Sequence, residues 1–143
     1  TVIIDIDRKL EEKTKRELTN VADVVVGMTS QKLTAINSLN NLIEKGEMLR
    51  KNNTLITIGR YDDKSKYNIK NISRNVLKQK QMVNTIPYNT VLFDSVQEGQ
   101  IIDMFIRMLS LKVKDENTFF IDEIKRLGDN IDSKVLEIQQ MMG

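Results

Sequence analysis

The chain has 143 residues, of which 40% are hydrophobic and 29% charged, and its formal net charge at pH 7 is +2. These are the values of a globular chain, and this length allows one domain with a buried core. The sequence contains no Cys and no His, which excludes disulfides, thiolate metal sites, cysteine nucleophiles and histidine general bases.

The apolar runs in the sequence are short. They fall well below the ~20 residues that a membrane-spanning helix needs, and no charged leader precedes a secretory apolar segment. We therefore expect a cytoplasmic protein. Because the chain enters an apolar run directly after Thr1, we also expect a fragment or a processed product of a longer protein.

Four short runs rich in β-formers predict strands, at residues 2–5, 24–27, 55–58 and 82–86. Each run is apolar almost throughout, which is typical of strands buried on both faces of a parallel sheet. Longer segments separate the runs, and their apolar residues recur every three or four positions. The alternation predicts an α/β fold in which helices flank a parallel β-sheet.

Three helices are predicted from this spacing and from residues that favour helix ends. The first follows Ser30 and ends near Gly46, the second begins at Ser65 or Asn68, and the third covers about residues 100–111. Pro87, the only proline, directly follows the fourth predicted strand, where the chain should leave the sheet. The faces expected to point inward are Leu33, Ile36, Leu39, Leu42 and Ile43, then Ile69, Ile72, Val76 and Leu77, then Ile101, Ile102, Phe105, Ile106 and Leu109.

Residues 112–143 form a separate amphipathic helical segment in this prediction. Its acidic residues outnumber its basic ones, so an anionic membrane surface would repel it. We expect it to pack on the rest of the chain or on a partner protein, and membrane binding is the disfavoured alternative. The apolar stripe is Phe120, Ile124, Leu127, Ile131, Val135, Ile138 and Met142.

The first predicted strand delivers a carboxylate, Asp5, at its carboxyl end. In open α/β sheets ligands bind beyond this edge, and an acidic side chain there can hold Mg²⁺ through water. Asp5 could equally cap the next helix, and the strand alone does not separate the two interpretations.

The order of several segments resembles the C-terminal half of ParA/MinD-type ATPases, over most of residues 1–111. Residues 1–5 look like the Walker B strand, and Asn20-Val21-Ala22-Asp23-Val24-Val25-Val26 looks like the strand that follows it. Residues 55–62 resemble the strand that ends near the adenine base of the nucleotide in this family. Residues 84–89 with 95–99 resemble a family stretch that contains Ile-Pro and ends at Gly. The polar linker after the first strand is similar to that of the relatives that position pili.

The resemblance implies half of a doubly wound P-loop ATPase domain, which binds ATP and Mg²⁺, dimerises when ATP is bound, and positions DNA or a cellular machine. Asp5 would associate with the metal through water. The residues implied around the base are Gly59, Arg60, Pro87, Tyr88 and Asn89. No catalytic residue is assigned.

The sequence departs from the family pattern at three places. Asp5-Ile6-Asp7-Arg8-Lys9 replaces a segment that usually carries a Gly beside the γ-phosphate, and Gly59-Arg60 stands where an amide side chain is common. The phosphate-binding sequence Gly-x-x-x-x-Gly-Lys-Ser/Thr does not occur. We therefore expect this chain alone to bind ATP weakly and not to hydrolyse it. A non-catalytic scaffold that binds other proteins is the alternative.

Residues 45–80 contain ten basic and three acidic residues, a net charge of +7 within a chain whose total is +2. Such a region could bind DNA phosphates without sequence specificity. A solvated helix face is the alternative, since the region has few aromatic residues to stack on bases. The DNA contacts that this hypothesis implies are Lys64, Lys66, Lys70, Arg74, Lys78 and Lys80.

Overall fold

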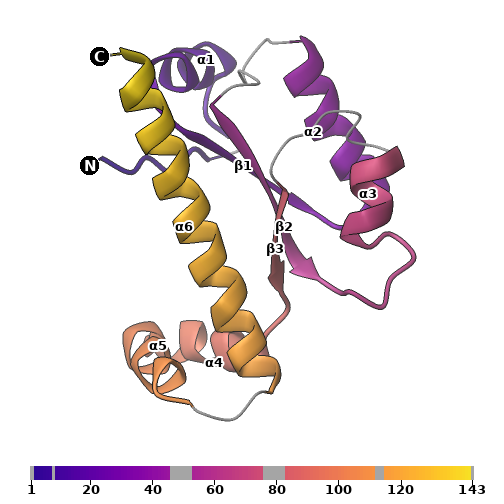
Figure 1. The fold of residues 1–143 in the computed structure, drawn as a ribbon, viewed down its shortest axis with the longest axis vertical. Coiled ribbons are helices and arrows are strands. Elements are labelled where there is room, and N and C mark those ends of the chain that lie inside the picture. Colours follow the sequence, from indigo (N-terminus) through magenta and orange to yellow (C-terminus); the bar gives the residue numbers. More distant parts are fainter. Residues whose placement is uncertain (1, 8, 46–52, 76–82, 112–114, 143) are drawn as a thin grey trace.

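The computed structural model describes residues 2–7, 9–45, 53–75, 83–111 and 115–142. The chain has an α/β fold in which helices flank a three-stranded parallel sheet, with a long C-terminal helix (Figure 1). In chain order the elements are α1 (Glu12–Val21), β1 (Val25–Ser30), α2 (Leu33–Lys45), β2 (Thr54–Tyr61), α3 (Ile69–Asn75), β3 (Val83–Pro87), α4 (Thr90–Glu98), α5 (Ile101–Leu109) and α6 (Glu116–Met142).

Strand β2 lies in the middle of the sheet, whose order is β1-β2-β3. Both pairs are parallel, and the register places Gly27 opposite Ile56 and Thr57 opposite Asn84. Residues 54–58 of β2 are all buried, as expected for a strand covered on both faces. The strands predicted at 24–27, 55–58 and 82–86 are confirmed as β1, β2 and β3, except that β1 begins at Val25 and that residue 82 lies outside the described residues. The prediction that these strands are buried on both faces is right for β2 and wrong for β1, in which no residue is buried.

Helices α2 and α3 cover one face of the sheet. Ile36 and Leu39 of α2 and Ile72 of α3 pack against Ile56 and Ile58 of β2 in one buried cluster. Each fully buried isoleucine contributes about 1.5–3 kcal/mol relative to an exposed one. The predicted inward faces of both helices are confirmed at these positions. The prediction is wrong for Leu33, which lies at the first residue of α2 and is exposed. Gly46, Val76, Leu77 and the side chain of Ile43 lie outside what the structure describes.

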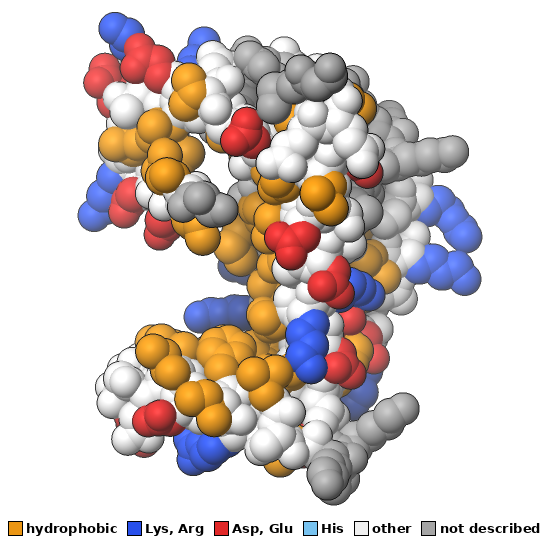
Figure 2. All heavy atoms as spheres, turned by 60° about the vertical axis from the view of Figure 1, so that its left-hand side comes forward, with side chains coloured by type: hydrophobic (Ala, Val, Ile, Leu, Met, Phe, Trp, Pro, Cys, Tyr) orange, Lys and Arg blue, Asp and Glu red, His pale blue; other side chains and the backbone are white. Residues whose placement is uncertain are grey.

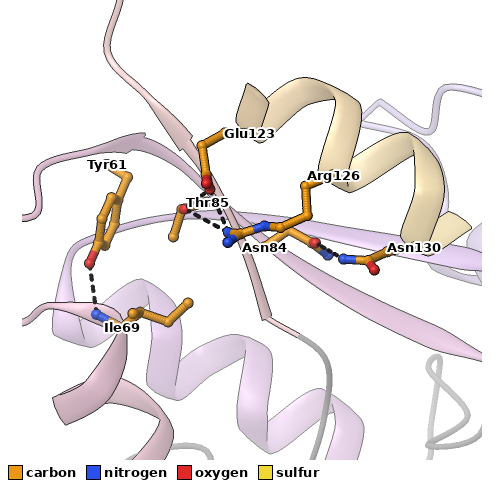
Figure 3. A network of polar contacts seen from close by, with 7 residues as sticks. All are labelled: Tyr61, Ile69, Asn84, Thr85, Glu123, Arg126 and Asn130. Carbon is orange, nitrogen blue, oxygen red and sulfur yellow. Dashed lines mark hydrogen bonds and ion pairs between the residues drawn. The ribbon is translucent and has the colours of Figure 1, made fainter. Parts of the chain in front are cut away.

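Helix α6 runs along β3 (Figure 1) and is bonded to it by polar side chains (Figure 3). The Oγ1 hydroxyl of Thr85 donates to Glu123, and the Arg126 guanidinium donates to the same carboxylate and, at 3.3 Å, to Thr85. Asn130 Nδ2 donates to Asn84 Oδ1 at 2.6 Å. The C-terminal segment is therefore a helix that packs on the sheet, as predicted.

A second cluster joins α5 to the start of α6. Met104 and Met108 of α5 are buried against Phe120 and Ile121 of α6. The prediction that Ile101, Ile102, Phe105, Ile106 and Leu109 all point inward is wrong: Phe105 is half-buried, and the other four are exposed. Helix α5 is apolar on two sides, and α6 covers the side that carries Met104 and Met108. The sequence did not predict α4, which ends at Gly99 with φ 69°, a left-handed conformation that glycine adopts without strain.

The strand predicted at residues 2–5 is also wrong. Residues 2–7 carry no regular secondary structure, and Val2 and Ile3 are 86% and 91% exposed. An apolar run forms a strand only where a neighbouring strand accepts its backbone hydrogen bonds. The polar linker predicted after it contains helix α1 instead.

Among the described helices, none is both long and apolar enough to cross a membrane. The longest, α6, carries exposed acidic residues along its length, including Asp122, Asp129 and Asp132.

Replacing Glu123 by Ala should lower the free energy of unfolding by about 1–3 kcal/mol, because Thr85 then loses its buried acceptor. Arg126 is about half exposed, so water can solvate it after the change. Glu137→Ala is the matched control on the same helix, since the exposed pair of Glu137 with Lys134 is worth at most about 0.5 kcal/mol. Urea denaturation of both variants gives the comparison, and equal losses would contradict a structural role for the Glu123 contact.

Candidate functional site

The carboxyl ends of the three strands meet at one edge of the sheet, which is where open parallel sheets bind ligands. In the register, Ser30 lies opposite Gly59, and Tyr61 lies opposite Pro87. The chain then continues from Pro87 directly into α4. The structure thus brings five of the predicted site residues to this edge, namely Gly59, Arg60, Pro87, Tyr88 and Asn89.

Arg60 has an unusual backbone at this edge. Its φ is 52°, and it is the only non-glycine among the described residues with a positive φ. The pairing with β3 shifts between Gly59 and Tyr61, so Arg60 is an extra residue that stands outside the ladder. A left-handed arginine costs roughly 1–2 kcal/mol. The bulge leaves the Arg60 side chain exposed beside the strand ends.

Gln31, which follows β1, holds the loop that follows β2. Its Nε2 donates to the carbonyl oxygens of Asp62 at 2.8 Å and Tyr67 at 2.9 Å, and its Oε1 accepts from the Asp62 N–H at 2.9 Å. One amide side chain therefore fixes the loop at three points. Sequence reasoning missed Gln31; a polar side chain between a predicted strand and the helix that follows it was the available signal.

The side chain of Asn89 makes hydrogen bonds that hold the fold together. Its Oδ1 accepts from the Leu92 N–H at 2.8 Å, which caps α4, and its Nδ2 donates to Asn117 of α6 at 2.9 Å. The side chain is buried. Tyr88, in contrast, is exposed. Of the residues predicted around a base, Arg60 and Tyr88 are those whose side chains are exposed at the edge, whereas Asn89 positions the turn.

A cap at the start of α6 fixes Asn117. Asp115 Oδ1 accepts from the backbone N–H groups of Asn117 and Thr118, both at 2.9 Å, and the Asp115 N–H donates to Thr118 Oγ1 at 2.8 Å. The hydrogen bond from the Thr118 backbone is the main reason that the pKa of Asp115 lies below its ordinary value. A carboxyl with a lowered pKa stabilises the fold above its unfolded-state pKa and loses that effect as pH falls through the lowered value. This cap therefore weakens only in acid.

Asp5 is not placed at the end of a buried strand. It lies exposed in the irregular segment 2–7, where its neighbour Asp7 accepts from the Lys9 N–H at 2.6 Å. The described residues contain no group of three or more acidic side chains able to hold a metal ion. A Mg²⁺ role for Asp5 remains a prediction, and it would require most ligands from water or phosphate.

The basic region follows β2 and continues along α3. Lys64, Lys66, Lys70 and Arg74 are all exposed, and the Lys66 ammonium lies 5.0 Å from the centre of the Tyr67 ring. Lys78 and Lys80 lie outside the described residues. The cations begin at the sheet edge that holds Arg60, so this end of the molecule presents positive charge beside the half-buried ring of Tyr67. This combination suits a planar or anionic ligand.

Comparison of the chain with protein-family models, with curated proteins and with solved structures finds no match.

Replacing Gln31 by Leu should loosen the loop between β2 and α3, because three hydrogen bonds are lost, each worth about 0.5–1.5 kcal/mol. Hydrogen exchange of the backbone amides from Asp62 to Ile69 should accelerate more than that of β1 and β2. Lys32→Leu is the control, because the neighbouring Lys32 is exposed. Unchanged exchange in this loop would show that Gln31 does not hold it.

Proposed function

We propose that this chain is the base-binding part of a ParA/MinD-type ATPase that positions DNA or a cellular machine, of the partition or pilus-locating kind. The observation that supports this proposal is the position of Arg60 and Tyr88. They lie nearly thirty residues apart in the sequence, and both lie at the carboxyl edge of a parallel sheet. Of the four strands that the resemblance to this family requires, the last three pair in parallel, which supports the proposal, whereas residues 2–5 do not form the first.

In this proposal Arg60 and Tyr88 contact the adenine base. A guanidinium and a phenol ring both stack on flat aromatic ligands, and each such contact contributes about 0.5–1.5 kcal/mol. Pro87 and the bonded Asn89 keep the turn rigid, so little ordering is required on binding. Bound ATP and Mg²⁺ would supply the phosphoryl chemistry. This chain has no phosphate-binding loop sequence of its own, and we assign no hydrolytic step to its residues.

The surface beside β1 suits the docking of a phosphate-binding half. Strand β1 is an edge of the described sheet, and Met28 of that strand is exposed, as are Val2, Ile3 and Ile4. Figure 2 shows a hollow between two lobes of the molecule, with apolar side chains along its walls. A second α/β half docked beside β1 would cover the exposed apolar side chains of Met28 and residues 2–4. The nucleotide-bound homodimer would then belong to the assembled protein.

A non-catalytic scaffold is the second candidate. The observation that favours it is the exposed row of carboxylates on α6, with Asp122, Asp129 and Asp132 free to meet a basic partner. The Asp7-Arg8-Lys9 sequence, which replaces the glycine-bearing segment, is consistent with lost nucleotide switching.

Photoaffinity labelling with an azido-ATP probe tests the base site in the full-length protein. Label should enter peptides that contain residues 59–62 or 87–89, and Arg60→Ala should weaken probe affinity by about tenfold, equivalent to one cation–π contact of about 1.4 kcal/mol. Lys125→Ala, which removes an exposed cation from α6, should leave labelling unchanged. If only other peptides are labelled, the base site is refuted, and the non-catalytic scaffold is then the remaining candidate.

Binding to mixed-sequence duplex DNA tests the basic region. Changing Lys64, Lys66, Lys70 and Arg74 together to Gln should weaken binding and flatten its salt dependence, because log K falls with log salt by about 0.9 for each phosphate neutralised. Changing Lys9, Lys13, Lys125 and Lys134 to Gln gives a control with the same loss of charge. Filter binding measures both series. A salt slope that is equal in the two variants would assign the cations to an ordinary solvated surface.

A further inference from the structure

The outer face of α5 is apolar and uncovered by the described residues. Ile102, Ile106 and Leu109 are 75%, 62% and 57% exposed, and helical spacing puts them on one stripe. The opposite side of the helix is held by Met104 and Met108 against Phe120 of α6. Figure 2 shows apolar side chains gathered over the lobe that contains α4 and α5. We name the three exposed residues the α5 stripe.

A patch of this kind points to an interaction surface. Monomeric proteins rarely expose large contiguous apolar patches, whereas interface cores are apolar and flanked by polar residues. The adjoining helix α4 adds exposed Phe93 and Val96. The exposed apolar residues of the lobe that contains α4 and α5 therefore extend beyond the α5 stripe.

The charges beside the α5 stripe are self-complementary. Asp103 and Arg107 lie one turn apart on the same flank of the helix, and both are exposed. They form no ion pair with each other: Arg107 Nε donates to the backbone carbonyl of Asp103 at 3.4 Å, and the Asp103 carboxylate has no partner among the described residues. Each flank thus presents one unpaired anion and one cation at a fixed spacing.

We propose that two copies of the chain associate through α5, antiparallel and related by a two-fold axis that passes beside Phe105. Phe105 lies midway between Asp103 and Arg107. In an antiparallel pair centred there, Asp103 of each copy faces Arg107 of the other, and the α5 stripes interleave. Such an isologous contact uses the same patch twice and closes on itself.

The same charges disfavour a lipid surface. Helices α4 and α5 carry Asp94, Glu98 and Asp103 against Arg107, so an anionic membrane would repel them. A partner of another sequence would need to supply a cation and an anion with the spacing that a second copy already has. The pairing requires no nucleotide and does not rest on the proposed ATPase function.

Charge reversal tests the α5 pair in the full chain by analytical ultracentrifugation without nucleotide. The wild type should be a dimer. Asp103→Arg and Arg107→Asp should each weaken association by about tenfold or more, because like charges then face each other twice in every dimer. Mixing these two variants should restore association as a one-to-one heterodimer, since every facing pair is then opposite in charge. Asp132→Arg on α6 is the charge-matched control and should still dimerise.

The double variant Asp103→Arg/Arg107→Asp should dimerise again. Its charges oppose the helix dipole, so recovery could not come from a more stable α5. Circular dichroism checks that each variant is folded. A monomeric wild type, a single reversal that leaves the dimer intact, or a failure of both the mixture and the double variant to recover would each overturn the proposal. Sedimentation of the wild type with anionic vesicles, combined with a monomeric state in solution, would replace the second copy by a lipid surface.

Discussion

Strand β2 is the element on which the rest of the structure depends. It is hydrogen-bonded on both edges, to β1 and to β3, and residues 54–58 are buried on both faces. Because both pairs are parallel, all three strands end at the same edge of the sheet. The bulge at Arg60 then marks the point where β2 leaves the ladder, and it exposes one side chain at the edge. The candidate site is therefore a direct result of strand direction.

Helix α6 packs along β3, which is an edge strand of the described sheet. It uses polar side chains for this contact. The Thr85, Glu123 and Arg126 bonds and the Asn84 to Asn130 bond fix the position of the helix along the strand. Polar contacts are directional, so they specify one alignment where an apolar contact would tolerate several. The same helix holds Asn117 in place, and Asn117 supports the turn at Asn89.

The apolar surfaces are unevenly distributed. The sheet is well covered by α2 and α3 on one face, whereas residues 2–4, Met28 and the α5 stripe are exposed. These exposed groups lie on different elements and suit different contacts. The surface beside β1 suits completion of the sheet by another segment, and the α5 stripe, with its reciprocal charges, suits a second copy. Nucleotide binding and self-association would thus use separate parts of one small fold.

The sequence by itself determined the α/β class, three of the four predicted strands and the helical segments at α2, α3, α5 and α6, because periodicity and apolar runs are local properties. It also placed Gly59, Arg60 and Pro87 at strand ends, which parallel pairing then brought to one edge. Only the tertiary structure decided the rest. Residues 2–5 have the composition of a strand but no neighbouring strand to pair with. Helix α5 is apolar on two sides, and the position of α6 determines which of the two is buried. Contacts between distant segments, such as Gln31 with Asp62, leave no periodic trace in the sequence, and they hold the site in place.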